Sequence, residues 1–274
     1  MPELPEVETI RRQLAPVLTG RRIEAAAGHP SAKFAAAAQA AGATMRGVRR
    51  RGKYLLVDLD DDRELVVHLG MTGRVLLSEA AAAAADARSP WEPYVRAWWR
   101  LDGGDLLQLR DIRRFGRVAV VGRGDHTSLP TLAALGPEPL SDDFTPESLY
   151  AALRRSGTRI KTQLINQRVV AGVGNIYADE ALWASGIDPA TRRLSQARST
   201  ALHAAVREVL MAGITNGGTT LRDYRAFTGD AGRNQHTLRC YGRAGEPCLR
   251  CGVTLRRRVI DGRSTTSCPA CQRR

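Results

Sequence analysis

The sequence has no apolar run long enough to cross a membrane, although 43% of its 274 residues are hydrophobic. A spanning helix needs about 20 such residues in succession. The N-terminus is acidic and contains prolines, unlike a secretory signal peptide. No internal repeat is visible. These absences predict a soluble intracellular protein that makes no use of the membrane, and its length allows two domains and a sizeable core.

Acidic residues are scarce relative to basic ones. The chain has 28 Asp and Glu against 41 Lys and Arg, which gives a net charge of +13. An excess of this size favours an anionic partner over a mere aid to solubility, and nucleic acid is the simplest such partner. Cysteines are also few, and four of the five form two CxxC pairs near the C-terminus. In an intracellular protein this pattern favours metal binding over disulfides.

The cysteine pairs are Cys248-x-x-Cys251 and Cys268-x-x-Cys271, with sixteen residues between them. Tetrahedral zinc needs four soft ligands, and two such knuckles joined by a hairpin supply them. Because protein fills all four positions, the zinc is predicted to be structural, and its binding is predicted to be coupled to folding. Cys240 lies outside the pattern and is expected to be an ordinary strand residue.

Apolar spacing divides the chain into a β-rich first part and a helical second part. A helix is predicted at about 5–18, and short strands are predicted at 21–26, 54–59, 64–69, 98–101, 106–110 and 118–121, as in a sandwich. The alanine-rich stretch 35–41 is predicted to be a short helix closed by Gly42, and the stretch 80–87 a loop. Beyond a proline-rich, acidic linker at 130–146, helices are predicted at 146–155, 159–167, 175–185 and 195–216.

A glycine turn, Gly172-Val173-Gly174-Asn175, joins two of these helices. Asn175 is expected to cap the second helix and to leave backbone N–H groups open to a phosphate. The same pattern also describes any tight turn between helices, so the phosphate interpretation depends on the basic surroundings.

Several loops carry side chains that suit DNA. Lys53 stands where a strand begins and is expected to point inward. Met71 and Phe115 each lie beside glycine in a tight loop. They are core residues by default, but apolar side chains on loop tips beside arginines also suit a protein that wedges into a duplex. Arg263, at the predicted hairpin tip between the knuckles, suits a phosphate or a groove, the alternative being a solvated surface charge.

The first nine residues, Met1–Thr9, place Pro2 beside Glu3, Glu6 and Glu8. Once the methionine is removed, Pro2 carries a terminal secondary amine beside carboxylates, which is a plausible nucleophile with acid/base partners. A free α-amine has a pKa of about 8 and is more often neutral at pH 7 than lysine. The alternative is simply a well-started helix, since acidic residues in a first turn complement the helix dipole.

The N-terminal stretch, the glycine–asparagine turn and the four-cysteine hairpin together resemble bacterial formamidopyrimidine-DNA glycosylase, a family that excises oxidised purines such as 8-oxoguanine. The resemblance covers nearly the whole chain. It implies an α+β multidomain fold with an N-terminal β-sandwich and flanking helices (1–134), a linker (135–146), a helix–two-turn–helix domain (147–235) and a zinc-finger β-hairpin (236–274). It also implies one structural Zn²⁺ and no diffusible cofactor.

The resemblance further implies a role for each matching residue. Pro2 attacks C1′, Glu3 is the acid/base, Glu6 supports the site, and a Schiff base then undergoes β- and δ-elimination. Lys53 contacts phosphate and assists catalysis, and His68, Asn175 and Arg263 are further phosphate contacts. Arg263 is also placed among the catalytic residues. Met71, Arg113 and Phe115 enter the duplex opposite the lesion, and Thr219, Thr220 and Tyr224 flank the base pocket. The implied partner is duplex DNA with oxidised bases or abasic sites, bound by a monomer in the bacterial cytoplasm at the nucleoid.

One departure from the family pattern leaves lesion preference open. Residues 228–235 replace the usual Pro-Gly-Tyr/Phe type of loop, which in the family folds over the flipped base. The rival functions are an endonuclease VIII-type glycosylase for oxidised pyrimidines, a non-catalytic lesion-sensing protein and a zinc-ribbon RNA-binding factor. Leu4 favours the purine branch, and the presence of Pro2, Glu3 and Lys53 argues against a non-catalytic protein.

Overall fold

The computed structural model describes residues 1–80, 93–221 and 224–274, and they divide into two compact units. Unit 1 comprises Met1–Pro2, Glu6–Ala133 and Thr220–Gly232, and unit 2 comprises Glu3–Pro5, Ala134–Thr219 and Arg233–Arg274. Among the described residues, no helix is both long and apolar enough to span a bilayer. The domain boundaries that the resemblance implies stay predictions.

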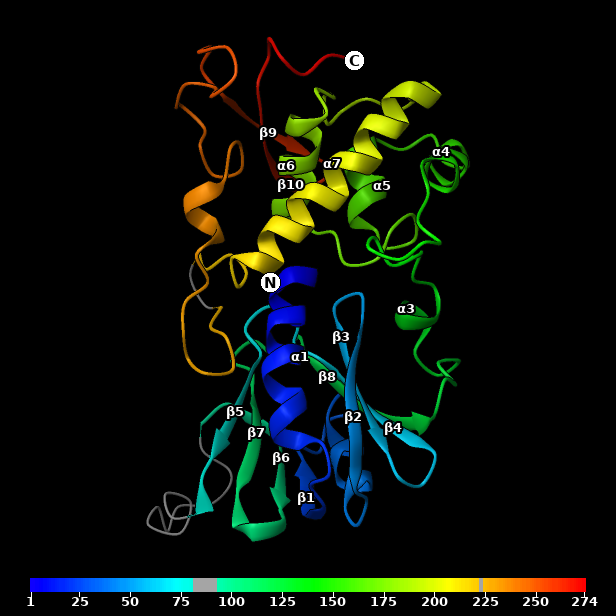
Figure 1. Cartoon of the computed structure of the whole chain (residues 1–274), viewed down its shortest axis with the longest axis vertical. Coiled ribbons are helices and arrows are strands. Elements are labelled where there is room, and N and C mark those ends of the chain that lie inside the picture. Colours follow the sequence, from blue (N-terminus) through cyan, green and yellow to red (C-terminus); the bar gives the residue numbers. More distant parts are fainter. Residues whose placement is uncertain (81–92, 222–223) are drawn as a thin grey trace. The chain divides into compact units, whose positions relative to one another are not determined.

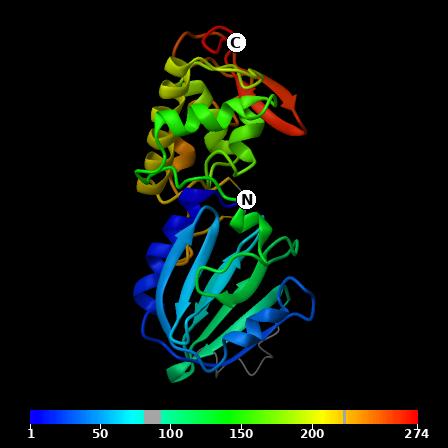
Figure 2. The same cartoon turned by 90° about the vertical axis from the view of Figure 1, so that its right-hand side faces the viewer.

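Unit 1 contains two four-stranded antiparallel sheets (Figures 1 and 2). The order in the first is β1 (Ile23–Gly28), β6 (Val95–Leu101), β7 (Leu106–Arg110) and β5 (Arg74–Ser78), and in the second β2 (Met45–Arg51), β3 (Tyr54–Leu59), β4 (Arg63–His68) and β8 (Arg117–Gly122). The described part of the unit also contains the short helical segments η1 (Ala35–Ala40), η2 (Asp102–Gly104) and α3 (Pro130–Ala133). The predicted sandwich is confirmed.

One core joins the two sheets to α1 (Leu4–Leu18), which runs alongside the strands (Figure 2). Val7, Ile10 and Leu14 recur at helical spacing and are buried in this core with side chains from both sheets. The predicted helix at 35–41 is the 3₁₀ helix η1, which contacts β1 and β6 in one sheet and β8 in the other. Gly42 follows it at φ +89°, a conformation that favours glycine.

The sequence missed two strands of the sandwich, β2 and β5. Strand β2 contains the run Arg49-Arg50-Arg51, which resembles a solvated charge cluster when read alone. In the fold, Arg49 pairs with Asp58 and Glu64, and Arg50 pairs with Glu8. Acids on the neighbouring strands and on α1 therefore allow arginines of this run to lie within a sheet. Most of the predicted loop at 80–87 lies outside the described residues.

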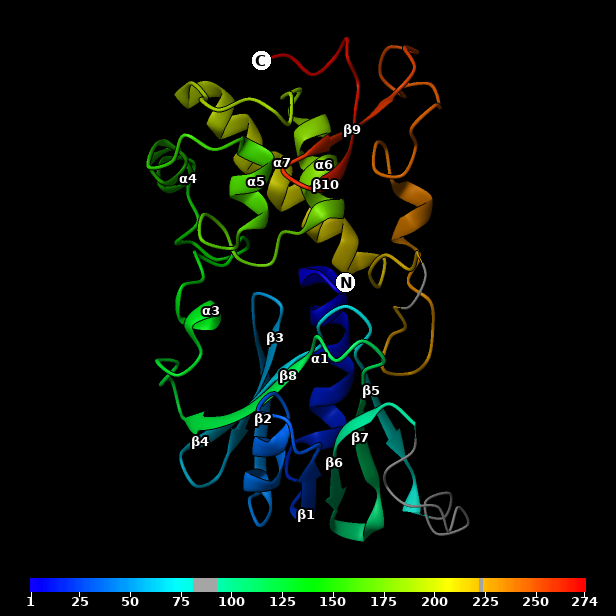
Figure 3. The same ribbon diagram turned by 180° about the vertical axis from the view of Figure 1, so that it is seen from behind.

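Unit 2 is helical and ends in a hairpin (Figures 1 and 3). Its elements are α4 (Pro146–Arg154), α5 (Ile160–Ile165), α6 (Asn175–Ala184), α7 (Gln196–Thr215), η3 (Asn234–Thr237), β9 (Arg256–Ile260) and β10 (Arg263–Ser267). The four predicted helices and the hairpin between the knuckles are confirmed. Helix α4 begins with a capping box between Thr145 and Ser148, and α7 begins at the cap Ser195.

The hairpin packs against α6 through a small core of its own that includes Trp183, Cys240 and Leu255. Cys240 lies in a bend, not in a strand as expected. Its thiol donates to the carbonyl of Thr266 at 3.1 Å, and burial raises the pKa of this thiol. The residue is therefore a packing residue under the hairpin.

Candidate functional site

The N-terminus of α6 is occupied by a carboxylate from the start of the chain. Glu3 is 2% exposed, and its oxygens accept hydrogen bonds from the backbone N–H groups of Gly174 (2.6 Å), Ile176 (2.9 Å) and Tyr177 (3.4 Å). Unsatisfied N–H groups and the helix dipole make this position an anion site. The anion found there is Glu3, so the predicted phosphate position on these N–H groups is wrong.

Asn175 also differs from its predicted role as a helix cap. The cap residue is Gly174, and the Asn175 side-chain amide donates to the carbonyl of Ser264 at 3.0 Å. A Cβ on Gly174 would lie 2.3 Å from the carboxyl carbon of Glu3, so only glycine admits the carboxylate. Gly172, at φ +83°, likewise has Leu4 against it, and its carbonyl accepts from the Leu4 N–H at 3.0 Å. The glycine turn thus receives residues 3–5.

The residues on either side of this anchor have different surroundings. Pro2 is buried, whereas Met1 is 51% exposed. Glu6 is 1% exposed, and its backbone carbonyl accepts from the Tyr224 hydroxyl at 3.4 Å. Pro2 and Glu3 are neighbours in the chain, so fixing Glu3 also restricts where the Pro2 nitrogen lies.

Lys53 and His68 lie at one end of the second sheet. Lys53 is buried in the turn between β2 and β3, as the sequence predicted. His68 ends β4 opposite Tyr54, and the two rings are 4.6 Å apart. Burial, together with the charges of Lys53 and Arg117, lowers the pKa of His68 to about 4. His68 is therefore neutral at pH 7. Its Nδ1 accepts from the Gly70 N–H at 3.2 Å, which leaves Nε2 to carry the proton.

Two neighbouring loops of unit 1 expose the predicted wedge residues. Met71 is 37% exposed and Phe115 is 49% exposed, so neither is a core residue. Arg113 is exposed as well, and its guanidinium lies 4.6 Å from the centre of the Phe115 ring. Gly70 and Gly116 bring the two loops together, because a Cβ on Gly70 would lie 2.5 Å from the Gly116 nitrogen.

The four predicted zinc ligands are brought together. The sulfur atoms of Cys248, Cys251, Cys268 and Cys271 all lie within 4.8 Å of one another. A tetrahedral ion with Zn–S bonds of about 2.3 Å places its sulfurs about 3.8 Å apart. The Trp183 indole N–H donates to Cys248 at 3.4 Å, and such N–H donors suit thiolates. The cluster therefore fits one structural zinc ion.

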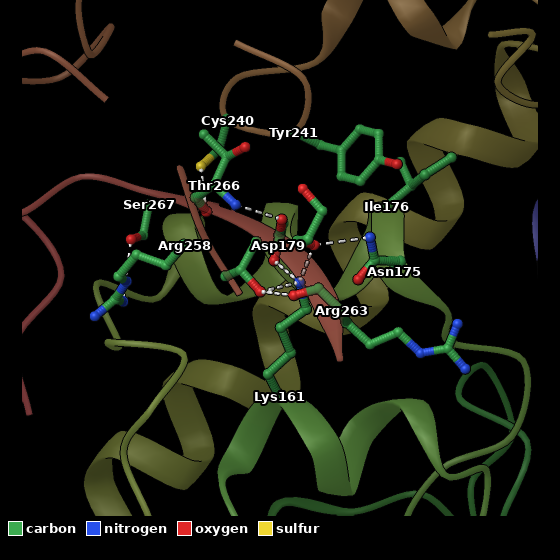
Figure 4. A network of polar contacts seen from close by, with 12 residues as sticks. Lys161, Asn175, Ile176, Asp179, Cys240, Tyr241, Arg258, Arg263, Thr266 and Ser267 are labelled. Carbon is green, nitrogen blue, oxygen red and sulfur yellow. Dashed lines mark hydrogen bonds and ion pairs between the residues drawn. The ribbon is translucent and has the colours of Figure 1, made fainter. Parts of the chain in front are cut away.

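A buried ion pair fastens the hairpin to the helices (Figure 4). Lys161 Nζ lies 2.6 Å from Asp179 Oδ1 and donates to the Ser264 carbonyl at 3.0 Å and the Thr265 hydroxyl at 2.8 Å. The other Asp179 oxygen accepts from the Thr266 N–H at 2.9 Å. Figure 4 shows Arg263 pointing away from this cluster. The network holds β10, and with it Arg263, at the start of α6, where Asn175 also binds the hairpin.

The residues predicted for the base pocket are separated between the units. Thr219, in unit 2, is 3% exposed and hydrogen-bonded to Tyr177 and Asn234. Thr220 and Tyr224 belong to unit 1, where the Thr220 hydroxyl donates to the Tyr224 carbonyl and Tyr224 packs on the core. Their role in binding a base stays a prediction.

Sequence reasoning missed Asp111, Lys161 and Asp179, all of which are almost fully buried. A single charged residue in a short helix that is otherwise uncharged, as Lys161 is in α5, is a weak signal of burial with a partner. The partner itself comes from a distant part of the chain, so the pairing is visible only in the fold.

Comparison with known proteins finds three family domains that match successive parts of the chain. Residues 1–118 match the formamidopyrimidine-DNA glycosylase N-terminal domain, residues 135–225 match the H2TH domain of that enzyme, and residues 245–274 match the zinc finger found in FPG and IleRS.

Full-length relatives agree. A formamidopyrimidine-DNA glycosylase of Deinococcus radiodurans is 44% identical over 285 residues, which cover 99% of this chain and 97% of the relative. The crystal structure of the MutM (FPG) protein of Thermus thermophilus is 42% identical, with a TM-score of 0.90 over 99% of this chain and 98% of that one. A Lactococcus lactis FPG mutant solved with Fapy-dG-containing DNA is 34% identical, with a TM-score of 0.87 over the whole of both chains. This chain therefore belongs to the formamidopyrimidine-DNA glycosylase family.

Proposed function

We propose that this protein is a bifunctional DNA glycosylase and AP lyase of base excision repair, which removes 8-oxoguanine and formamidopyrimidines from duplex DNA. Membership of the family over the whole chain supports this function, as does the Fapy-dG-containing DNA bound by the Lactococcus lactis relative. The observation that carries the proposal is the anchoring of Glu3 on α6 directly after Pro2.

Pro2 is the nucleophile in this mechanism. While Met1 is attached, the Pro2 nitrogen is an amide, so removal of the methionine is required. The free secondary amine then attacks C1′, and the damaged base leaves with a proton from Glu3. The amine gives up its own proton, which passes to O4′ as the C1′–O4′ bond breaks and the sugar ring opens, so that the Pro2 nitrogen and C1′ form the Schiff base. The resulting Schiff base loses the 3′ phosphate by β-elimination and the 5′ phosphate by δ-elimination. Glu3 is the acid/base, positioned by the N–H groups of α6, and Glu6 supports the site.

The remaining predicted residues bind DNA. Lys53, His68, Asn175 and Arg263 contact phosphates, and Lys53 and Arg263 also assist catalysis. The neutral His68 donates from Nε2. Met71, Arg113 and Phe115 fill the gap left by the extruded base, which offsets part of the unstacking cost. Zinc maintains the fold of the finger and takes no part in the chemistry. We further propose that the protein acts as a monomer in the bacterial cytoplasm at the nucleoid.

Borohydride trapping tests the nucleophile. The mature protein should form a covalent complex with a duplex containing 8-oxoguanine, because borohydride reduces the Schiff base. Pro2→Gly supplies a primary and more flexible amine, so trapping should slow by at least about 100-fold, while affinity for the duplex changes little. Pro16→Ala, at an exposed position of α1, is the matched control. If Pro2→Gly lost binding and trapping equally, the role assigned to Pro2 would be wrong.

Lesion choice is tested separately, because residues 228–235 depart from the family pattern. Duplexes with 8-oxoguanine, formamidopyrimidine or thymine glycol should be cleaved with preference for the two purine lesions. Preference for thymine glycol would instead indicate the endonuclease VIII type. An absence of cleavage and of trapping on all three duplexes would indicate a non-catalytic lesion sensor.

A further inference from the structure

The exposed wedge is built on two separate loops that must act as one. The Met71 loop (residues 69–73) follows β4, and the Phe115 loop (residues 111–116) follows β7. When these loops enter a duplex, their exposed tips press against stacked bases. Loops without fixed geometry would have to be ordered at that moment, which weakens binding.

A single buried carboxylate joins the loops. Asp111 is 0% exposed, and its Oδ1 accepts from the Thr72 hydroxyl at 2.6 Å, while its Oδ2 accepts from the Gly116 N–H at 2.7 Å. Thr72 directly follows Met71, and Gly116 directly follows Phe115. Thr72 Oγ1 also accepts from the Arg113 N–H at 3.1 Å. The carboxylate therefore fixes the backbone next to both apolar tips and, through Thr72, the backbone at Arg113.

Asp111 is itself held firmly at the end of β7. Its N–H donates to the Tyr94 carbonyl at 2.9 Å, and its carbonyl accepts from Arg96 Nε at 2.8 Å. Arg96 is nearly buried, and its guanidinium is attracted by Asp111. An acid buried at this depth is costly unless its hydrogen bonds are satisfied, and both of its oxygens are.

We propose that Asp111 is a positioning residue for the wedge, which fixes the Met71 and Phe115 loops to each other before DNA is bound. The proposal rests on the proposed function, since it concerns how that activity enters a duplex. Asp111 is buried beneath the loops and contacts no substrate. It acts through Thr72 and Gly116. Its removal should lower the rate of the steps that need an inserted wedge.

Three variants separate geometry from charge. Asp111→Ala removes both acceptors. Asp111→Asn keeps an acceptor for the Gly116 N–H, and its amide nitrogen donates to Thr72 Oγ1, so it restores the connection without the charge. Thr72→Val removes the hydroxyl that links the loops at nearly constant volume. Asp60→Ala is the matched control, because Asp60 also binds a backbone N–H, that of Thr44, at the far end of β3.

The experiment compares substrates that need the wedge with one that does not. With Asp111→Ala and Thr72→Val, excision of 8-oxoguanine from duplex DNA should fall by about 10- to 100-fold. Lyase activity on a single-stranded abasic oligonucleotide should stay close to wild type, because that substrate has no base stack to fill. Asp111→Asn and Asp60→Ala should retain duplex excision.

A spectroscopic readout reports the wedge directly. A duplex with 2-aminopurine opposite a tetrahydrofuran abasic analogue should brighten when wild-type protein inserts the wedge and unstacks the probe. The increase should be largely lost with Asp111→Ala and Thr72→Val and restored with Asp111→Asn. Equal loss of single- and double-stranded activities would overturn the proposal in favour of a purely structural role, as would full duplex excision by Thr72→Val. Failure of the proposed function is distinguishable, because the wild-type protein would then cleave neither substrate.

Discussion

The two units hold their exposed loop tips through different interactions. The tips are the Met71 and Phe115 loops in unit 1 and the Arg263 turn of the hairpin in unit 2. In unit 1, Asp111 holds the apolar tips through a hydroxyl and a backbone N–H, which are neutral donors. In unit 2, Asp179 holds the hairpin of Arg263 through the Lys161 ammonium and one backbone N–H. The apolar wedge therefore rests on neutral hydrogen bonds, and the cationic tip rests on a buried ion pair.

The ion pair in unit 2 carries an electrostatic cost, because both charged groups are buried. Burial raises the pKa of Asp179 to about 6 and lowers the pKa of Lys161, although each group opposes the shift in the other. The Lys161–Asp179 ion pair is tolerated in the protein interior, but either charge buried without the other would destabilise the fold. The Asp111 carboxylate accepts from neutral donors instead, and the nearby Arg96 donates to the Asp111 backbone carbonyl, so no cation completes the hydrogen bonds of the carboxylate itself.

Removal of Lys161 should therefore cause the largest effect. Lys161→Met leaves Asp179 without its cation and should lower the free energy of unfolding by about 3–5 kcal/mol. Urea unfolding at pH 7 measures the change. Adding Asp179→Asn to Lys161→Met should recover most of the loss, because the second variant removes the uncompensated charge.

Arg258→Gln is the control for that experiment. Arg258, on strand β9 of the hairpin, pairs with Asp188, which follows α6. The Arg258 side chain is 35% exposed, so its loss should lower the free energy of unfolding by no more than about 1 kcal/mol. If Lys161→Met cost no more than Arg258→Gln, the contrast between an ion-paired hairpin and a neutral wedge would be wrong.

The salt dependence of DNA binding distinguishes the charged Arg263 tip from the apolar Phe115 tip. Arg263→Gln should weaken binding to a tetrahydrofuran duplex by about tenfold and reduce the slope of log affinity against log salt by about 1. Phe115→Ala should also weaken binding but leave the slope unchanged, because it releases no counterion. Fluorescence anisotropy over a salt series measures both. An equal change of slope in the two variants would remove the distinction between a charged and an apolar tip.

The last effect is absent at pH 7 and appears only when unit 1 is acidified. The pKa of His68 is lowered to about 4 from 6.5, so the unfolded chain takes up a proton more readily than the folded one between these values. The contribution of neutral His68 to stability is complete above pH 6.5 and is lost as pH falls through 4. His68→Gln should flatten this part of the stability curve, as urea unfolding at several pH values would show. An unchanged curve would mean that the pKa of His68 is not lowered in the folded protein.

Local patterns in the sequence were sufficient for much of the fold. The apolar stripe of α1 and the short apolar runs of β3 and β7 predicted those elements, because each pattern is complete within a few residues. The spacing of Cys248, Cys251, Cys268 and Cys271 predicted the metal cluster for the same reason. The two cysteines of each zinc knuckle lie three positions apart, and sixteen residues join the knuckles, so the whole pattern can be read from a short stretch of sequence.

The rest depended on partners distant in the chain. Asn175 has the residue type and place of a helix cap, yet Glu3 supplies the anion at α6, and nothing near Asn175 indicates this. Strand β2 was missed because Asp58, Glu64 and Glu8 pair with its arginines only in the fold. Asp111 could not be distinguished from a surface aspartate in a turn, since its burial is produced by the meeting of two loops.

The anchoring of Glu3 also has a consequence for how the protein matures. The anchor begins one residue after the proposed nucleophile, and its hydrogen bonds to α6 do not involve the Pro2 nitrogen. We therefore expect the Glu3 anchor to form whether or not the initiator methionine is attached. A fusion tag at the N-terminus would yield a well-folded but chemically silent protein, whereas a tag at the C-terminus leaves the amine to be released.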